Sequence, residues 1–166
     1  MLRLDTPDEE AAKILGGLHF EKHQILAEPS SYLACYYLNI VVNESTGAAS
    51  YFYGHSLLCL AKHLHEGNFA NGSNALPAAF FWMRKSRDMG YKAAREMLKE
   101  WETIGQNICA NCGKEVQAGE KYKQCSKCKA QWYCSKECQV EAWRAGHRND
   151  CKRARMLKFE DYLNAE

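Results

Sequence analysis

Seven cysteines and one histidine lie near the C-terminal end of the chain, at spacings that suit metal ligands. They form four pairs: Cys109 and Cys112, Cys125 and Cys128, Cys134 and Cys138, and His147 and Cys151. A Cys-x-x-Cys turn lets two sulfurs converge on one ion at about 2.3 Å. A spacing of four residues places two side chains on one face of a helix. Eight such ligands predict two tetrahedral zinc sites.

The predicted sites are structural and not catalytic. The protein fills every coordination position, which leaves none open for water or substrate. Zinc is favoured over iron because thiolates with one imidazole suit closed tetrahedral sites of a redox-inert ion. The other two cysteines, Cys35 and Cys59, have no partner at ligand spacing. We expect both to be buried residues of the core.

Residues 109–151 resemble the MYND zinc finger. The ligand order is six cysteines, one histidine and one cysteine, with Gln139 directly after the sixth cysteine and Trp143 four residues further on. In that family the first and third pairs bind one ion, and the second and fourth pairs bind the other. The resemblance therefore implies two interleaved sets of zinc ligands: Cys109, Cys112, Cys134 and Cys138, and then Cys125, Cys128, His147 and Cys151. Spacing alone leaves sequential pairing open.

The resemblance also implies a function. MYND fingers bind short proline-containing peptides of the Pro-x-Leu-x-Pro kind, beside a strand and against a small helix. The positions that match the family's peptide contacts are Ser126, Gln139 and Trp143. One helical face can present both Gln139 and Trp143, because they are four residues apart. The alternative is that Trp143 packs inward, against Val140 or the helical domain.

Upstream of the finger, the sequence predicts a helical domain over residues 1–104. Thr6 and the proline that follows it suit a helix start. Residues 32–42 fit a buried helix better than a lone strand. Apolar spacing and closing glycines predict three further helices, over about 48–67, 75–89 and 91–104.

Residues 47–104 resemble the Sel-like, tetratricopeptide-related helical hairpin repeats. The resemblance rests on a small-residue helix at 48–58, then a Trp-x-Arg-Lys-Ser type helix that closes on glycine within 79–98. At least three repeats are usually needed for a continuous core, so residues 1–46 should add helices or the finger should cap the stack. The predicted fold is mainly α, with antiparallel helical-hairpin repeats followed by a two-zinc finger containing a short β-hairpin and helix.

Charge also separates the two parts of the 166-residue chain. Residues 1–104 carry 10 Lys and Arg against 12 Asp and Glu, whereas residues 105–155, the expected finger domain, carry 11 against 5. Residues 156–166 remain as a C-terminal tail. Seven thiolates and two Zn²⁺ lower the formal charge of the finger from +6 to +3. A basic surface leaves a nucleic-acid-binding zinc module as one alternative, which the bound metal weakens.

The remaining sequence features favour an intracellular adaptor without enzymatic activity. The acidic start does not suit a secretory signal, and no run reaches the roughly 18 apolar residues of a membrane span. No phosphate-binding loop, nucleophile elbow or carboxylate pair is present in the sequence. We expect a nuclear or cytoplasmic protein whose partners are proline-containing peptides, with a second protein bound by the helical repeats and neither nucleic acid nor membrane. A ubiquitin-ligase-associated adaptor is the other alternative.

Overall fold

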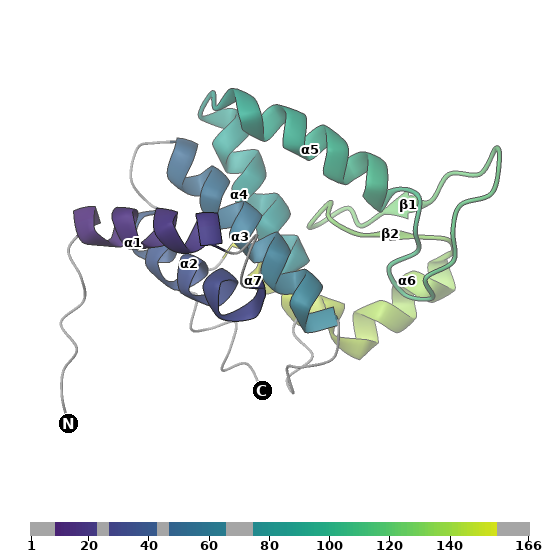
Figure 1. Cartoon of the computed structure of the whole chain (residues 1–166). Helices are drawn as coiled ribbons and strands as arrows, with labels where there is room; N and C mark the ends of the chain where they lie inside the picture. Colours follow the sequence, from purple (N-terminus) through teal and green to yellow (C-terminus); the bar gives the residue numbers. More distant parts are fainter. Residues whose placement is uncertain (1–8, 23–26, 43–46, 66–74, 156–166) are drawn as a thin grey trace.

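The computed structural model describes residues 9–22, 27–42, 47–65 and 75–155. These residues are mainly helical, as predicted (Figure 1). Within the described ranges, five helices precede the finger: α1 (Glu9–Lys22), α2 (Ala27–Val41), α3 (Gly47–His65), α4 (Leu76–Asp88) and α5 (Lys92–Gly105). The prediction of a helix rather than a strand at 32–42 is confirmed by α2. The predicted helix start at Thr6 lies outside the described residues.

The finger supplies short elements joined by turns. Strands β1 (Lys123–Gln124) and β2 (Trp132–Tyr133) pair antiparallel, with Lys123 opposite Tyr133. Helix α6 (Lys136–Ala142), the π-helical turn η1 (Trp143–His147) and helix α7 (Arg148–Arg153) follow. The predicted short β-hairpin and helix are therefore present in the finger.

Helices α3 and α4 form an antiparallel hairpin. Their midpoints meet where Tyr53 and Trp82, both fully buried, pack edge to face with ring centroids 5.5 Å apart. The hydroxyl of Ser86, near the end of α4, donates a 2.6 Å hydrogen bond to the carbonyl of Gly47 at the start of α3. Cys35 of α2 is fully buried, as predicted, whereas Cys59 of α3 is only half-buried.

Gly54 allows α3 and α4 to approach closely. A Cβ atom at this position would lie 3.0 Å from the carbonyl oxygen of Ala79 and 3.0 Å from the backbone nitrogen of Met83. Both atoms belong to the backbone of α4 and cannot rotate away. Gly17 of α1, by contrast, faces open space, because no atom lies within 4 Å of a Cβ placed at this position.

The two glycines therefore give opposite predictions for substitution by alanine. Gly54→Ala is expected to lower the free energy of unfolding by about 1–3 kcal/mol through overpacking. Gly17→Ala is expected to raise it by about 0.5–1 kcal/mol, because alanine loses less backbone entropy in a helix. Urea unfolding of the zinc-loaded chain measures both. A stability of Gly54→Ala equal to or above that of the unmodified protein would contradict the close packing of α3 on α4.

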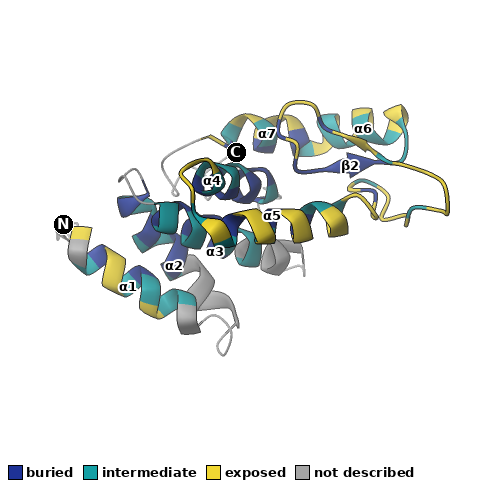
Figure 2. Cartoon of the chain, turned by 90° about the horizontal axis from the view of Figure 1, so that it is seen from above, coloured by how far each residue is buried: buried dark blue, intermediate teal, exposed yellow. Residues whose placement is uncertain are grey.

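The finger packs directly on α4 and α5, at the opposite side of the molecule from α1 (Figures 1 and 2). The Phe80 ring of α4 meets the rings of Trp101 and Trp132 edge to face, at centroid distances of 5.4 and 6.0 Å. A Cβ on Gly105, the last residue of α5, would lie 2.5 Å from the Trp132 ring. One hydrophobic core therefore runs from the helices into the finger.

None of the helices in the described part of the chain combines the length and apolar content that a membrane span requires. Figure 2 shows that one side of α5 is buried against the core and the other is exposed. This helix is therefore amphipathic and not apolar on all sides. Its buried residues are Ala94, Leu98 and Trp101. Met97 of the same helix is half-buried.

Candidate metal centre

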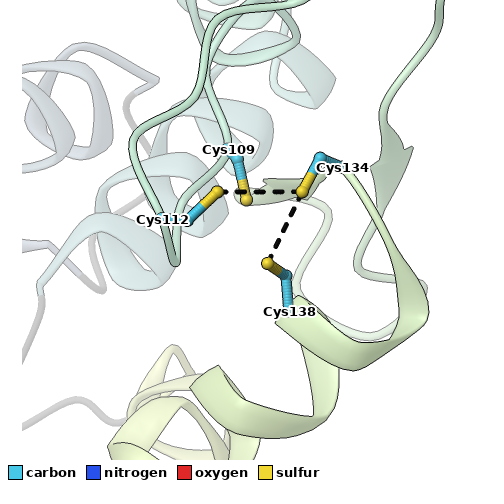
Figure 3. A group of neighbouring side chains, drawn as sticks. All are labelled: Cys109, Cys112, Cys134 and Cys138. Carbon is cyan, nitrogen blue, oxygen red and sulfur yellow. Dashed lines mark hydrogen bonds between the residues drawn. The ribbon is translucent and has the colours of Figure 1, made fainter.

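Four cysteines from three segments converge in the first ligand cluster, which we call site 1 (Figure 3). Its members are Cys109, Cys112, Cys134 and Cys138. The Cys134 sulfur lies 3.7 Å from that of Cys112 and 3.5 Å from that of Cys138. Four sulfurs at about 2.3 Å from one zinc would be about 3.8 Å apart, so the spacing suits a tetrahedral ion.

The second cluster, site 2, contains the only histidine among the predicted ligands. Its members are Cys125, Cys128, His147 and Cys151. The Nε2 atom of His147 lies 3.3 Å from the Cys125 sulfur and 3.7 Å from the Cys128 sulfur. In each cluster all four ligand atoms lie within 4.8 Å of one another. The residues present therefore fit two zinc ions.

The two clusters use the ligand pairs in alternation. Site 1 takes the first and third pairs and site 2 takes the second and fourth. The interleaved arrangement implied by the resemblance is confirmed, and sequential pairing is excluded. Interleaving follows from the short β-hairpin, which carries the second pair away from the first and returns the chain so that Cys134 lies beside Cys112.

Each Cys-x-x-Cys turn closes on a residue with positive φ. The Gly113 amide donates to the carbonyl of Cys109 at 2.9 Å, and the Lys129 amide donates to that of Cys125 at 2.9 Å. Gly113 has a φ of 70° and Lys129 a φ of 52°. Glycine adopts this conformation freely, whereas lysine does so at a cost. The local sequence gives no sign that Lys129 adopts this conformation.

Helix capping and ring packing orient two further ligands, Cys138 and His147. Ser135 caps α6 by accepting a hydrogen bond from the amide of Cys138 at 3.2 Å. The His147 imidazole is buried beside two aromatic rings, with centroids 6.0 Å away for Tyr133 and 5.7 Å for Trp143. Burial lowers the pKa of His147 and favours the neutral imidazole that binds zinc.

Without metal, the thiols of each site differ in acidity. Burial raises the pKa of Cys109, but backbone N–H groups, first among them that of Cys112, outweigh it and lower the pKa to about 6. The hydrogen bond with Cys138, followed by burial, raises the pKa of Cys134 to about 12. In site 2 burial raises the pKa of Cys128 well above its ordinary value. Zinc binding therefore displaces protons, and zinc affinity falls as the pH falls.

The three positions predicted to contact a peptide lie in one region of the finger. Ser126 is exposed, and Gln139 and Trp143 are half-buried. The Trp143 amide donates to the carbonyl of Gln139, one turn earlier. The ammonium of Lys127, next to Ser126, lies 5.0 Å from the centre of the Trp143 ring. The structure therefore places the turn that carries Ser126 beside Trp143. The contact of Trp143 with His147 was not predicted.

Comparison with known proteins identifies this segment. Residues 109–151 match the family model of the MYND finger. The chain is similar to a SET and MYND domain-containing protein of Dictyostelium discoideum, with 40% identity over 48 residues, which are 27% of this chain and 9% of that protein. It is also similar to ubiquitin carboxyl-terminal hydrolase 19 of Arabidopsis thaliana, with 43% identity over 44 residues, 26% of this chain and 6% of that protein.

The chain thus spans less than a tenth of either relative. No solved structure matches it. Residues 109–151 are a MYND-type finger, a zinc-binding module of a kind that serves protein interaction. The match stops at the finger, so the resemblance of residues 47–104 to Sel-like repeats stays a prediction.

Proposed function

We propose that this chain is an intracellular, non-enzymatic adaptor whose finger binds a proline-containing peptide of the Pro-x-Leu-x-Pro kind. The observation that carries this proposal is the half-exposed Trp143, with Gln139 one turn away and the turn carrying Ser126 beside it. Trp143 supplies flat apolar area on which a proline or leucine side chain can pack. Gln139 and Ser126 supply hydrogen-bonding groups for the peptide backbone.

Strand β1 supports an extended peptide as the ligand. It is exposed, and among the described strands it pairs only with β2. The Ala110 amide donates to the carbonyl of Trp132 in β2 at 2.8 Å, which leaves β1 as the edge of the hairpin. A peptide that adds a strand gains main-chain hydrogen bonds, and a neighbouring pocket or ring supplies specificity.

The closed ligand sets support a role without catalysis, because four protein ligands saturate each tetrahedral ion. The preceding helices support a two-part adaptor. We infer that α1 to α5 are Sel-like repeats whose outer surface binds a second protein, while the finger holds the peptide.

The peptide site is tested by substitutions in α6 and η1. Fluorescence anisotropy with a labelled Pro-x-Leu-x-Pro peptide should show affinity at least about 30-fold lower for Trp143→Leu, the loss typical of a buried aromatic anchor. Gln139→Ala should weaken binding about 10-fold by removing a hydrogen-bonding group. Val140→Ala, a control on the exposed face of the same helix, should leave it unchanged.

Zinc content must accompany these measurements because Trp143 packs on the ligand His147. Among the described residues, no ring contact of this kind joins the Gln139 side chain to a metal ligand, so Gln139→Ala separates peptide binding from zinc binding. Equal affinity for Gln139→Ala, Val140→Ala and the unmodified protein would count against this peptide site.

Exposed lysines favour one competing function. Lys121, Lys123 and Lys127 are all exposed around β1 and the second Cys-x-x-Cys turn. They would suit a nucleic-acid-binding module, whose affinity falls steeply with salt because counterions are released on binding. The adaptor is favoured if the finger still binds the peptide at high salt while its affinity for any oligonucleotide falls steeply. Ubiquitin transfer from a charged conjugating enzyme would instead favour the ubiquitin-ligase-associated alternative.

A further inference from the structure

We propose that Arg84 in helix α4 is a positioning residue for zinc site 2. It lies outside the finger, 44 residues before Cys128 in the sequence. Its guanidinium holds the turn between Cys125 and Lys129 in the shape that directs both sulfurs of that turn at the ion. The helical domain thereby takes part in building a metal site whose ligands all belong to the finger.

The Arg84 guanidinium donates hydrogen bonds to two backbone carbonyls and is largely shielded from solvent. Its Nη1 donates a 2.8 Å hydrogen bond to the carbonyl of the zinc ligand Cys128, and its Nη2 donates a short hydrogen bond to the carbonyl of Lys129. The carboxylate of Glu102, in α5, lies 3.6 Å from the same Nη2. The Arg84 side chain is 18% exposed. A planar guanidinium with its donors in a fixed fork can hold two neighbouring carbonyls in one orientation, which a lysine ammonium cannot do.

The turn needs such support because of the residue at its end. Lys129 adopts a φ of 52°, a conformation that costs an L residue with a Cβ atom, whereas Gly113 occupies the equivalent place in the first turn at no such cost. The Lys129 carbonyl accepts a second hydrogen bond, of 2.9 Å, from the Gln124 side chain. The strained residue is thus the one that Arg84 holds.

Packing fixes the guanidinium in place. Its central carbon lies 5.2 Å from the centre of the Phe80 ring, which also contacts Trp132 of the finger. If the turn lost its shape, Arg84 would remain beside these rings without its carbonyl acceptors. Glu102 would still pair with the guanidinium, but two hydrogen bonds from a charged donor would be lost. That loss is destabilising, so the position of α4 and the shape of the turn stabilise each other.

The experiment measures metal affinity at each site separately. Co²⁺ serves as the probe because four thiolates and three thiolates with one imidazole give different visible spectra, and zinc competition then gives the affinity of each site. Arg84→Gln and Arg84→Lys should both weaken metal binding at site 2 by about 10–100-fold, the range for residues that orient metal ligands. Site 1 should change less than about twofold, within the error of independent sites.

Two further variants distinguish positioning from other effects. Arg87→Gln removes an arginine one turn along α4 that pairs with Asp88, and it should leave both sites unchanged. Lys129→Gly removes the strain in the turn and should restore most of the site 2 affinity to Arg84→Lys. The proposal is overturned if Arg84→Lys binds metal as the unmodified protein does, if sites 1 and 2 weaken equally, or if Lys129→Gly gives no recovery.

Discussion

Removal of zinc is expected to unfold residues 109–151. The segment has two-residue strands and a six-residue final helix, and its buried residues include the metal ligands Cys109, Cys125 and Cys128. Structural zinc contributes roughly 10–16 kcal/mol of apparent binding free energy at pH 7, more than such short elements supply. Amide shifts of the finger should therefore collapse to unfolded values when a strong chelator is added.

The helices should respond unequally to the same treatment. Contacts between α3 and α4, such as Tyr53 on Trp82, do not involve the finger and should persist. Phe80 of α4 loses its contact with Trp132, and Gly105 at the end of α5 lies beside the same ring, so amides of α4 and α5 should shift. Zinc, but not magnesium, should restore the spectrum, because thiolates select the softer ion. Unchanged finger shifts after complete zinc removal would refute a metal-dependent fold.

Trp132→Ala is expected to destabilise the zinc-loaded chain strongly. Trp132 is 7% exposed, meets Phe80 edge to face, and fills the space beside Gly105 at the end of α5. Loss of a buried tryptophan costs about 3–5 kcal/mol because both transfer free energy and packing are lost. Denaturant unfolding of the zinc-loaded chain measures this change.

Ile104→Ala is the matched control for Trp132→Ala. Ile104 is also apolar and lies one residue before Gly105, but it is 56% exposed. Its substitution should alter the free energy of unfolding by less than about 0.5 kcal/mol. A cost for Trp132→Ala no larger than that for Ile104→Ala would mean that the finger and helices do not share a core.

Local spacing explains why so much of the metal centre was predictable. Each ligand pair sits within five residues, so the geometry of a turn or helix fixes it, and the count of eight fixes two sites. Spacing did not determine which pairs combine. That depends on the β-hairpin, whose two strands flank the second pair and whose second strand leads into the third pair. Only the resemblance to MYND fingers implied the interleaved answer that the structure confirms.

The helices were predictable for a similar reason, and the contacts between distant segments were not. Apolar periodicity and closing glycines gave α4 and α5 to within a residue or two. Nothing in the local sequence of Arg84 indicates that it reaches the carbonyls of Cys128 and Lys129. Periodicity likewise predicts which face of α3 is apolar, but not that Gly54 lies against the backbone of α4.

Anomalous diffraction at the zinc absorption edge tests the central claim most directly, because it locates each ion without assuming its ligands. Crystals of the zinc-loaded protein should give two peaks of similar height in the finger. One should lie among the sulfurs of Cys109, Cys112, Cys134 and Cys138, and the other among Cys125, Cys128, His147 and Cys151. A single peak, or two peaks each surrounded by sequential pairs of ligands, would contradict the two interleaved zinc sites.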